Sequence, residues 1–119
     1  MPNDHILFIS KAEHDGEVES VLVDNGLQVK KINSIHELKE VEALDRYGIV
    51  LLDLDLPCVN NNSIYRLRSK TGQSWIIGFS SKRYNPHLKD SLRSCMFAVL
   101  SKPADAKELM YCMQSLQEH

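Results

Sequence analysis

The stretch IVLLDLDLP, residues 49–57, decides the fold of this chain of 119 residues. Its first four residues are apolar without a break, and a carboxylate follows at Asp53. An uninterrupted apolar run is typical of a strand that is buried on both faces of a parallel sheet. Similar runs occur at 6–9, 75–79 and 97–100, whereas residues 27–32 mix polar and apolar side chains. The sequence therefore predicts five strands, with the mixed one at an edge of the sheet.

Helical signals lie between these strands. They are an apolar face at Val18, Val21 and Leu22 ended by Gly26, a capping box at 34–37 followed by Leu38, Val41 and Leu44, the pair Ile64 and Leu67, the cap Asn85-Pro86, and the cap Asp105 before Leu109, Cys112, Met113 and Leu116. Strands that alternate with helices form a parallel sheet covered on both faces. We expect a flavodoxin-like (βα)5 three-layer α/β sandwich with a five-stranded parallel sheet of order 2-1-3-4-5.

The composition is that of one ordinary globular domain, which we expect to span residues 1–119. Hydrophobic residues make up 43% and charged residues 25% of the chain, which is enough for one core. The net charge of −2 gives no reason to expect binding to nucleic acid or to a membrane surface. The three cysteines lack CxxC spacing, and the chain has no signal peptide and no run of about 20 apolar residues. These features favour a reduced, cytoplasmic protein without a membrane span.

Residues that carry chemistry follow the predicted strands. Ser10 and Lys11 come after the first strand, Asp53 after the third, Ser80 after the fourth and Lys102 after the fifth. The carboxyl ends of parallel strands gather at one edge of the sheet, where ligands bind. We therefore expect a carboxylate, a hydroxyl and one or two ammonium groups to converge there. No GxGxxG or GxxxxGK[ST] motif is present for a nucleotide, so an independent enzyme is not expected.

In this order, and over essentially the whole chain, these motifs resemble the CheY-like receiver domains of response regulators in two-component systems. The segment LLDLDLP resembles the phosphoacceptor segment of the family, with Asp53 at the aspartate. Ser80 stands where the family has Thr or Ser, and Lys102-Pro103 resembles the Lys-Pro of the family. The resemblance covers one receiver domain, whole or cut from a longer response regulator.

The resemblance implies a phosphoprotein of phosphorelay signal transduction rather than an enzyme. In this family the aspartate attacks a phosphohistidine of a partner, here a sensor histidine kinase or another signalling protein, and becomes an acyl phosphate. The resemblance gives Ser80 and Lys102 the role of holding the phosphoryl oxygens, while Mg²⁺ neutralises the charge that develops. It also implies that the fourth helix, fifth strand and fifth helix form the surface for a partner or for a homodimer.

The sequence departs from the family at the acidic pair that holds Mg²⁺, because Ser10 and Lys11 occupy its two positions. Hard oxygen ligands and negative charge are lost, so a Mg²⁺ site formed by Asp53 and Asp55 is predicted to be weak or absent. We expect the ammonium group of Lys11 to point at Asp53 and partly to replace the cation. Two unit charges about 4 Å apart interact by about 4 kcal/mol at an effective dielectric constant of about 20. Rescue of metal binding by Glu13 and Asp15 is the alternative.

A second departure lies at Val99, three residues before Lys102, where the family often carries a Tyr or Phe that changes rotamer during signalling. A valine has no ring to move, so we expect weaker coupling between Ser80 and the partner surface. Cys58 is either a plain loop cysteine or, if its thiol pKa is lowered, a redox site. Two functions stay open: a working phospho-receiver, and a phosphorylation-independent interaction or dimerisation scaffold with a receiver fold.

Overall fold

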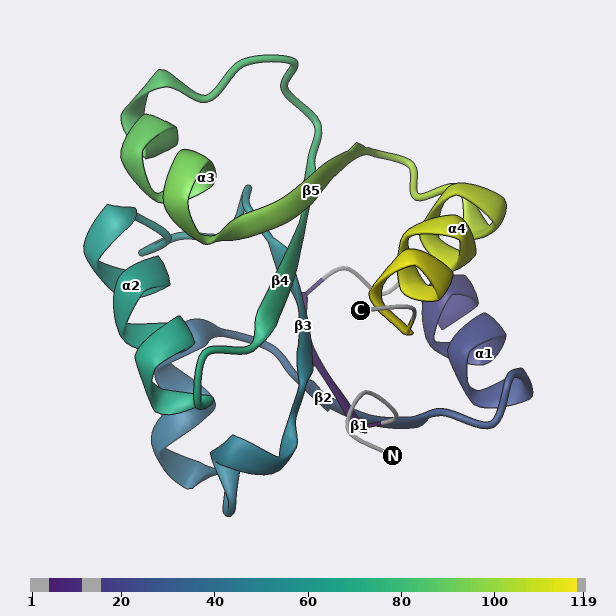
Figure 1. Ribbon diagram of the computed structural model, residues 1–119. Helices are drawn as coiled ribbons and strands as arrows, with labels where there is room; N and C mark the ends of the chain where they lie inside the picture. Colours follow the sequence, from purple (N-terminus) through teal and green to yellow (C-terminus); the bar gives the residue numbers. More distant parts are fainter. Residues whose placement is uncertain (1–4, 12–15, 118–119) are drawn as a thin grey trace.

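The computed structural model describes residues 5–11 and 16–117 of the chain (Figure 1). Its strands are β1 (His5–Ile9), β2 (Gln28–Ile32), β3 (Ile49–Asp53), β4 (Trp75–Ser80) and β5 (Met96–Ser101). Its α-helices are α1 (Gly16–Asp24), α2 (Asn61–Lys70), α3 (Lys89–Cys95) and α4 (Ala106–Gln117). The same described residues also contain the short 3₁₀ helices η2 (Ile35–Glu40), η3 (Leu44–Arg46) and η4 (Pro86–Leu88).

The five strands form one parallel sheet in the order β2-β1-β3-β4-β5, which confirms the predicted topology. Strand β2 lies at an edge, and its side chains alternate between exposed and partly buried positions before Ile32. The inner strand β3 is buried along its whole length, as its uninterrupted apolar run predicted. In Figure 1, α1 and α4 cover one face of the sheet, and α2 and α3 cover the other.

Two separate apolar cores fill the space between the sheet and its helices. Leu7, Val50 and Ile76 face the first core, beneath α2, α3 and the 3₁₀ helices. Phe8, Leu51 and Ile77 face the second core, beneath α1 and α4. The alternation follows from strand geometry, because successive side chains point to opposite faces of a sheet. The strands are thereby fixed in register, and so are the residues that follow them.

The second predicted helix differs from expectation, because η2 and η3 replace it. The side chain of Ser34 makes no capping hydrogen bond, and the carboxylate of Glu37 instead accepts the backbone N–H of Asn33 at 2.9 Å. The backbone then becomes extended at Val41 and left-handed at Ala43, where φ is 53°. A non-glycine residue in the left-handed region ends a helix, so the apolar spacing at Leu38, Val41 and Leu44 does not continue as one.

Of the two caps predicted for the remaining helices, the one at Asp105 is confirmed and the one at Asn85 is not. Asn60 and Ser63 form a reciprocal capping box on α2, and the carboxylate of Asp105 accepts the backbone N–H of Lys107 at 2.8 Å at the start of α4. Asn85 precedes Pro86 as predicted, but its side chain makes no cap. None of the helices in residues 5–11 and 16–117 has the length and apolar composition needed to cross a bilayer.

Candidate functional site

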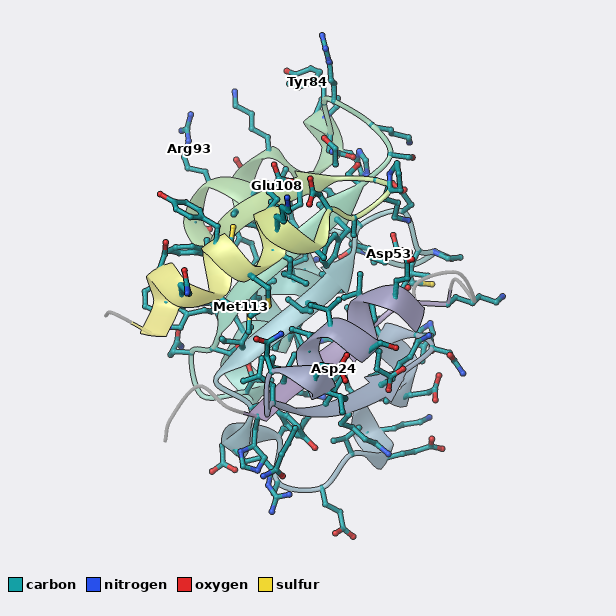
Figure 2. The ribbon with its side chains drawn as sticks, turned by 90° about the vertical axis from the view of Figure 1, so that its right-hand side faces the viewer. Asp24, Asp53, Tyr84, Arg93, Glu108 and Met113 are labelled. Carbon is teal, nitrogen blue, oxygen red and sulfur yellow. The ribbon has the colours of Figure 1, made fainter. Side chains whose placement is uncertain are left out.

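The strand register brings the carboxyl ends of β1, β3, β4 and β5 together at one edge of the sheet. Ile9 pairs with Leu52, Asp53 pairs with Phe79, and Ser80 pairs with Ser101. The residues next along the chain are therefore neighbours: Ser10 lies beside the end of β3, and Lys102 lies beside the end of β4. The backbone N–H of Lys102 donates to the carbonyl of Ser80 at 3.0 Å. In Figure 2 the labelled Asp53 lies near the N-terminal end of α1, opposite the end that carries Asp24.

The centre of the site is an ammonium group shared by two carboxylates. Nζ of Lys102 lies 2.7 Å from Oδ1 of Asp53 and 3.1 Å from Oδ2 of Asp55. The side chain of Asp53 is 6% exposed, whereas those of Asp55 and Lys102 are 23% and 22% exposed. Burial disfavours the charged form of Lys102, but its hydrogen bonds and attraction to Asp53 and Asp55 outweigh burial and raise the lysine pKa. Lys102 is therefore held in its charged form beside both acids.

The side chain of Asp55 is directed towards the end of β4 by two donors there. Its Oδ2 accepts the backbone N–H of Ser81 at 3.0 Å, and its Oδ1 accepts the hydroxyl of Ser80 at 3.4 Å. Its own backbone N–H donates to Oδ1 of Asp53 at 2.9 Å. Burial alone would raise the pKa of Asp55, but the hydrogen bonds from Ser81 and the attraction of Lys102 lower it overall.

Ser80 links these acids to the loop after β4 through hydrogen bonds. It is buried, and its Oγ accepts the backbone N–H of Lys82 at 3.0 Å and the side-chain amide of Asn85 at 3.3 Å. Asn85 thus supports the site rather than capping the following helix. The pattern Asn-Pro gave no signal for this role, because an asparagine before a proline is also an ordinary helix cap.

The two residues that replace the acidic pair point in different directions. Ser10 is fully buried and lines a small pocket together with Asp53, Lys102 and Val18. Lys11 is exposed, and the ion pairs described for Asp53 and Asp55 are both with Lys102. The expected pairing of Lys11 with Asp53 is therefore wrong. The physical reason is that Lys102 already supplies the cation against Asp53, so the ammonium group of Lys11 can stay hydrated at the surface.

The donors in the described part of this pocket do not fit Mg²⁺. The ion prefers several hard oxygen ligands, and here Asp53 and Asp55 already share the ammonium group of Lys102 while Ser10 supplies no carboxylate. Within residues 5–11 and 16–117, no group of three or more His, Cys, Asp or Glu side chains is placed to hold a metal. Glu13 and Asp15, the alternative ligands, lie outside the described residues.

Val99 and Cys58, which the sequence singled out, are both exposed. Val99 is 43% exposed on β5 and borders a surface depression with Tyr84 and Leu92. Cys58 is exposed in the loop after β3, with a φ of 68°. Trp75 begins β4, at the end of the sheet opposite to Asp53, so its fluorescence is a poor reporter of the site.

Solved structures of receiver domains share this fold. A two-component response regulator from Clostridium difficile has a TM-score of 0.84 at 15% identity, with 98% of both chains covered. The receiver domain of an HD domain-containing protein from Pseudomonas fluorescens has a TM-score of 0.84 at 16% identity, with 98% of this chain and 96% of that chain covered.

A third similar structure is a response regulator from Burkholderia pseudomallei with a phosphorylated aspartic acid, a calcium ion and citrate. Its TM-score is 0.77 at 16% identity, and the alignment covers 98% of this chain and 72% of that chain. No protein-family model matches the chain, and no curated protein matches it in sequence. The chain therefore has the receiver-domain fold of two-component response regulators.

Proposed function

We propose that this chain is an atypical receiver domain in two-component signal transduction, with Asp53 at the phosphoacceptor position. The observation that carries the proposal is the buried Asp53 carboxylate held 2.7 Å from the ammonium group of Lys102, on the strand next to Ser80. A carboxylate, a lysine and a hydroxyl at the ends of β3, β5 and β4 are the groups that phosphoryl transfer to a protein carboxylate requires. The phosphorylated aspartic acid in the similar Burkholderia pseudomallei structure supports the same chemistry.

In the proposed reaction an oxygen of Asp53 attacks the phosphorus of a phosphohistidine on a sensor histidine kinase. The new P–O bond forms as the P–N bond breaks, and the electron pair leaves with the imidazole, which takes up a proton. Lys102 and Ser80 stabilise the charge on the phosphoryl oxygens. Lys102 must release part of its contact with Asp53 for this attack, so the reaction is expected to be slow in the absence of other cations.

The test is incubation of the protein with acetyl phosphate, followed by intact-mass measurement. We expect one added phosphoryl group, present on only part of the protein and lost in Asp53→Asn. Asp24→Ala is the matched control, because Asp24 is exposed at the far end of α1. A modification that persists in Asp53→Asn would contradict the assignment of the acceptor.

A second candidate is a phosphorylation-independent interaction or dimerisation scaffold. The observation that favours it is the pairing of Lys102 with both carboxylates, together with Ser10 in place of a metal-binding acid. The proposed surface is the face of α3, β5 and α4, where Tyr84, Val99 and Tyr111 are exposed. The absence of any phosphoryl group after acetyl phosphate treatment, with a concentration-dependent mass in light scattering that Val99→Asp abolishes, would favour this candidate.

A further inference from the structure

We propose that Asp55 is an internal ligand that occupies the place of the phosphoryl oxygens in this site. Oδ1 and Oδ2 of Asp55 are held by the three kinds of donor that an anion site uses: the Ser80 hydroxyl, the Ser81 backbone N–H and the Lys102 ammonium group. We call these three donors the oxyanion cradle. The identification of a phosphoryl group as the outside ligand of this cradle rests on the proposed function.

The geometry shows that the carboxylate is bound by the cradle and does not merely lie near it. The three contacts are 3.4, 3.0 and 3.1 Å long, and their donors come from the end of β4, the loop after β4 and the residue after β5. The backbone N–H of Asp55 is fixed on Asp53 at 2.9 Å, which directs the side chain across the pocket towards these donors. The lowered pKa of Asp55 agrees with a carboxylate that the cradle keeps ionised.

An anion from solution would have to displace this carboxylate. An ionised carboxylate only accepts hydrogen bonds, so Asp55 is both a steric occupant of the cradle and a negative charge inside it. A phosphate or phosphoryl group would meet that charge at close range in a partly buried site, where repulsion between like charges is weakly screened. Asp55 therefore lowers the affinity of the cradle for outside oxyanions, and it orders the ends of β4 and β5 without phosphate.

The test uses inorganic phosphate and a pair of variants that both lack the phosphoacceptor carboxylate. Asp53→Asn keeps the cradle filled by Asp55, whereas Asp53→Asn with Asp55→Ala empties it and leaves Lys102 unpaired. We expect the backbone amide signal of Ser81 in ¹H–¹⁵N spectra to shift and saturate with phosphate in the double variant. In the single variant we expect the apparent affinity for phosphate to be at least tenfold lower. A tenfold difference corresponds to about 1.4 kcal/mol in binding free energy.

Two further variants and a salt control complete the design. Asp53→Asn with Asp24→Ala removes an exposed aspartate far from the site and should behave like Asp53→Asn alone. Asp53→Asn with Asp55→Asn keeps the side-chain volume and removes only the charge, so it still tests the idea if the alanine variant does not fold. Potassium chloride at equal ionic strength separates phosphate binding from a general salt effect.

Equal phosphate affinity in the presence and absence of the Asp55 carboxylate would overturn the inference, and so would the absence of saturable binding in both variants that lack this carboxylate. Neither outcome depends on whether Asp53 is phosphorylated, because every variant in the comparison carries Asp53→Asn. Failure of the proposed function would instead appear in the acetyl phosphate experiment on the unmodified protein. The two ideas can therefore fail separately.

Discussion

At the scale of single residues, the site contains two carboxylates and one ammonium group. Asp53 is buried, and Lys102 is the cation that the structure places against it and against Asp55. Buried ionised groups are tolerated only when they are paired and hydrogen-bonded. The charge of Lys102 therefore has a structural role in addition to any role in phosphoryl transfer.

The first prediction concerns Lys102→Ala. At neutral pH it leaves Asp53 and Asp55 as uncompensated carboxylates, and we expect a loss of about 2 kcal/mol in the free energy of unfolding, less than for a fully buried pair because Lys102 is partly exposed. Urea unfolding measures the loss. Lys107→Ala, at an exposed position in the first turn of α4, is the control and should change stability by less than about 0.5 kcal/mol.

The effect of Lys102→Ala has a defined pH window. The pKa of Asp55 is lowered in the folded protein, so its stabilising contribution is present above the unfolded aspartate value of about 3.9 and is lost as the pH falls through the lower folded value. The pKa of Lys102 is raised, so its contribution is lost as the pH rises above about 10.4. A stability difference that stayed constant from about pH 3 to about pH 7 would contradict this account.

The second prediction concerns the metal. Ser10 lines the same pocket as Asp53, so Ser10→Asp places a second carboxylate beside it. Without metal this buried charge should lower the melting temperature, and Mg²⁺ should raise it again by binding the folded state. Thermal unfolding with and without Mg²⁺ measures both effects. Ser10→Asn has similar size without the charge and should show no Mg²⁺ dependence, and an equal response of both variants would contradict the role of charge.

The sequence predicted the convergence of Asp53, Ser80 and Lys102 because strand ends are fixed by topology. It left the direction of Asp55 open, because a side chain two residues beyond a strand is directed by loop hydrogen bonds to Ser80 and Ser81. It also did not predict that Lys11 is exposed, because Lys11 lies beyond the end of β1, where strand alternation no longer fixes the direction of a side chain.

At the scale of elements, the loop after β3 is fixed by the strand beside it. The backbone N–H of Leu54 donates to the carbonyl of Phe79 at 2.8 Å, and the side chain of Leu54 lies over Gly78. A Cβ atom added at Gly78 would lie 2.8 Å from Cδ1 and 3.1 Å from Cγ of Leu54. Leu54 stands between Asp53 and Asp55, so this contact links the packing of β4 to the position of both carboxylates.

The third prediction follows from that contact. Gly78→Ala should destabilise the fold by about 1–3 kcal/mol through overpacking against Leu54. It should also shift the amide signal of Asp55 in ¹H–¹⁵N spectra. Combining it with Leu54→Ala removes the clash, so the double variant should lose less stability than the sum of the single losses. Additive losses would show that the contact with Leu54 is not the cause.

The element that the sequence misjudged is the one between β2 and β3. Its apolar spacing at Leu38, Val41 and Leu44 satisfies a helical period, and these residues do pack against the first core. Two 3₁₀ segments joined by a left-handed residue at Ala43 bury Leu38 and partly bury Val41 and Leu44. Periodicity reports which side chains must be buried, and several backbone conformations meet that requirement in a short segment.

At the scale of the whole molecule, the sheet separates two cores that must form together. Ile76 and Ile77 are neighbours on β4, both fully buried, yet Ile76 packs in the first core and Ile77 in the second. The site lies where the inner strands end between these cores, so it depends on both. A single cooperative unfolding transition is expected for a domain of this size.

The fourth prediction tests whether the two cores unfold in one transition, and it uses the variants Ile76→Val and Ile77→Val. Each removes one methyl group from one core and should cost about 0.5–1.5 kcal/mol. The cavities open on opposite faces of the sheet and share no lining side chains, so the double variant should lose the sum of the two within about 0.5 kcal/mol. Far-UV circular dichroism and Trp75 fluorescence should report one common midpoint in urea. Separate midpoints would mean that the two cores unfold separately, whereas a coupling well above that margin would mean that the sheet transmits a change in one core to the other.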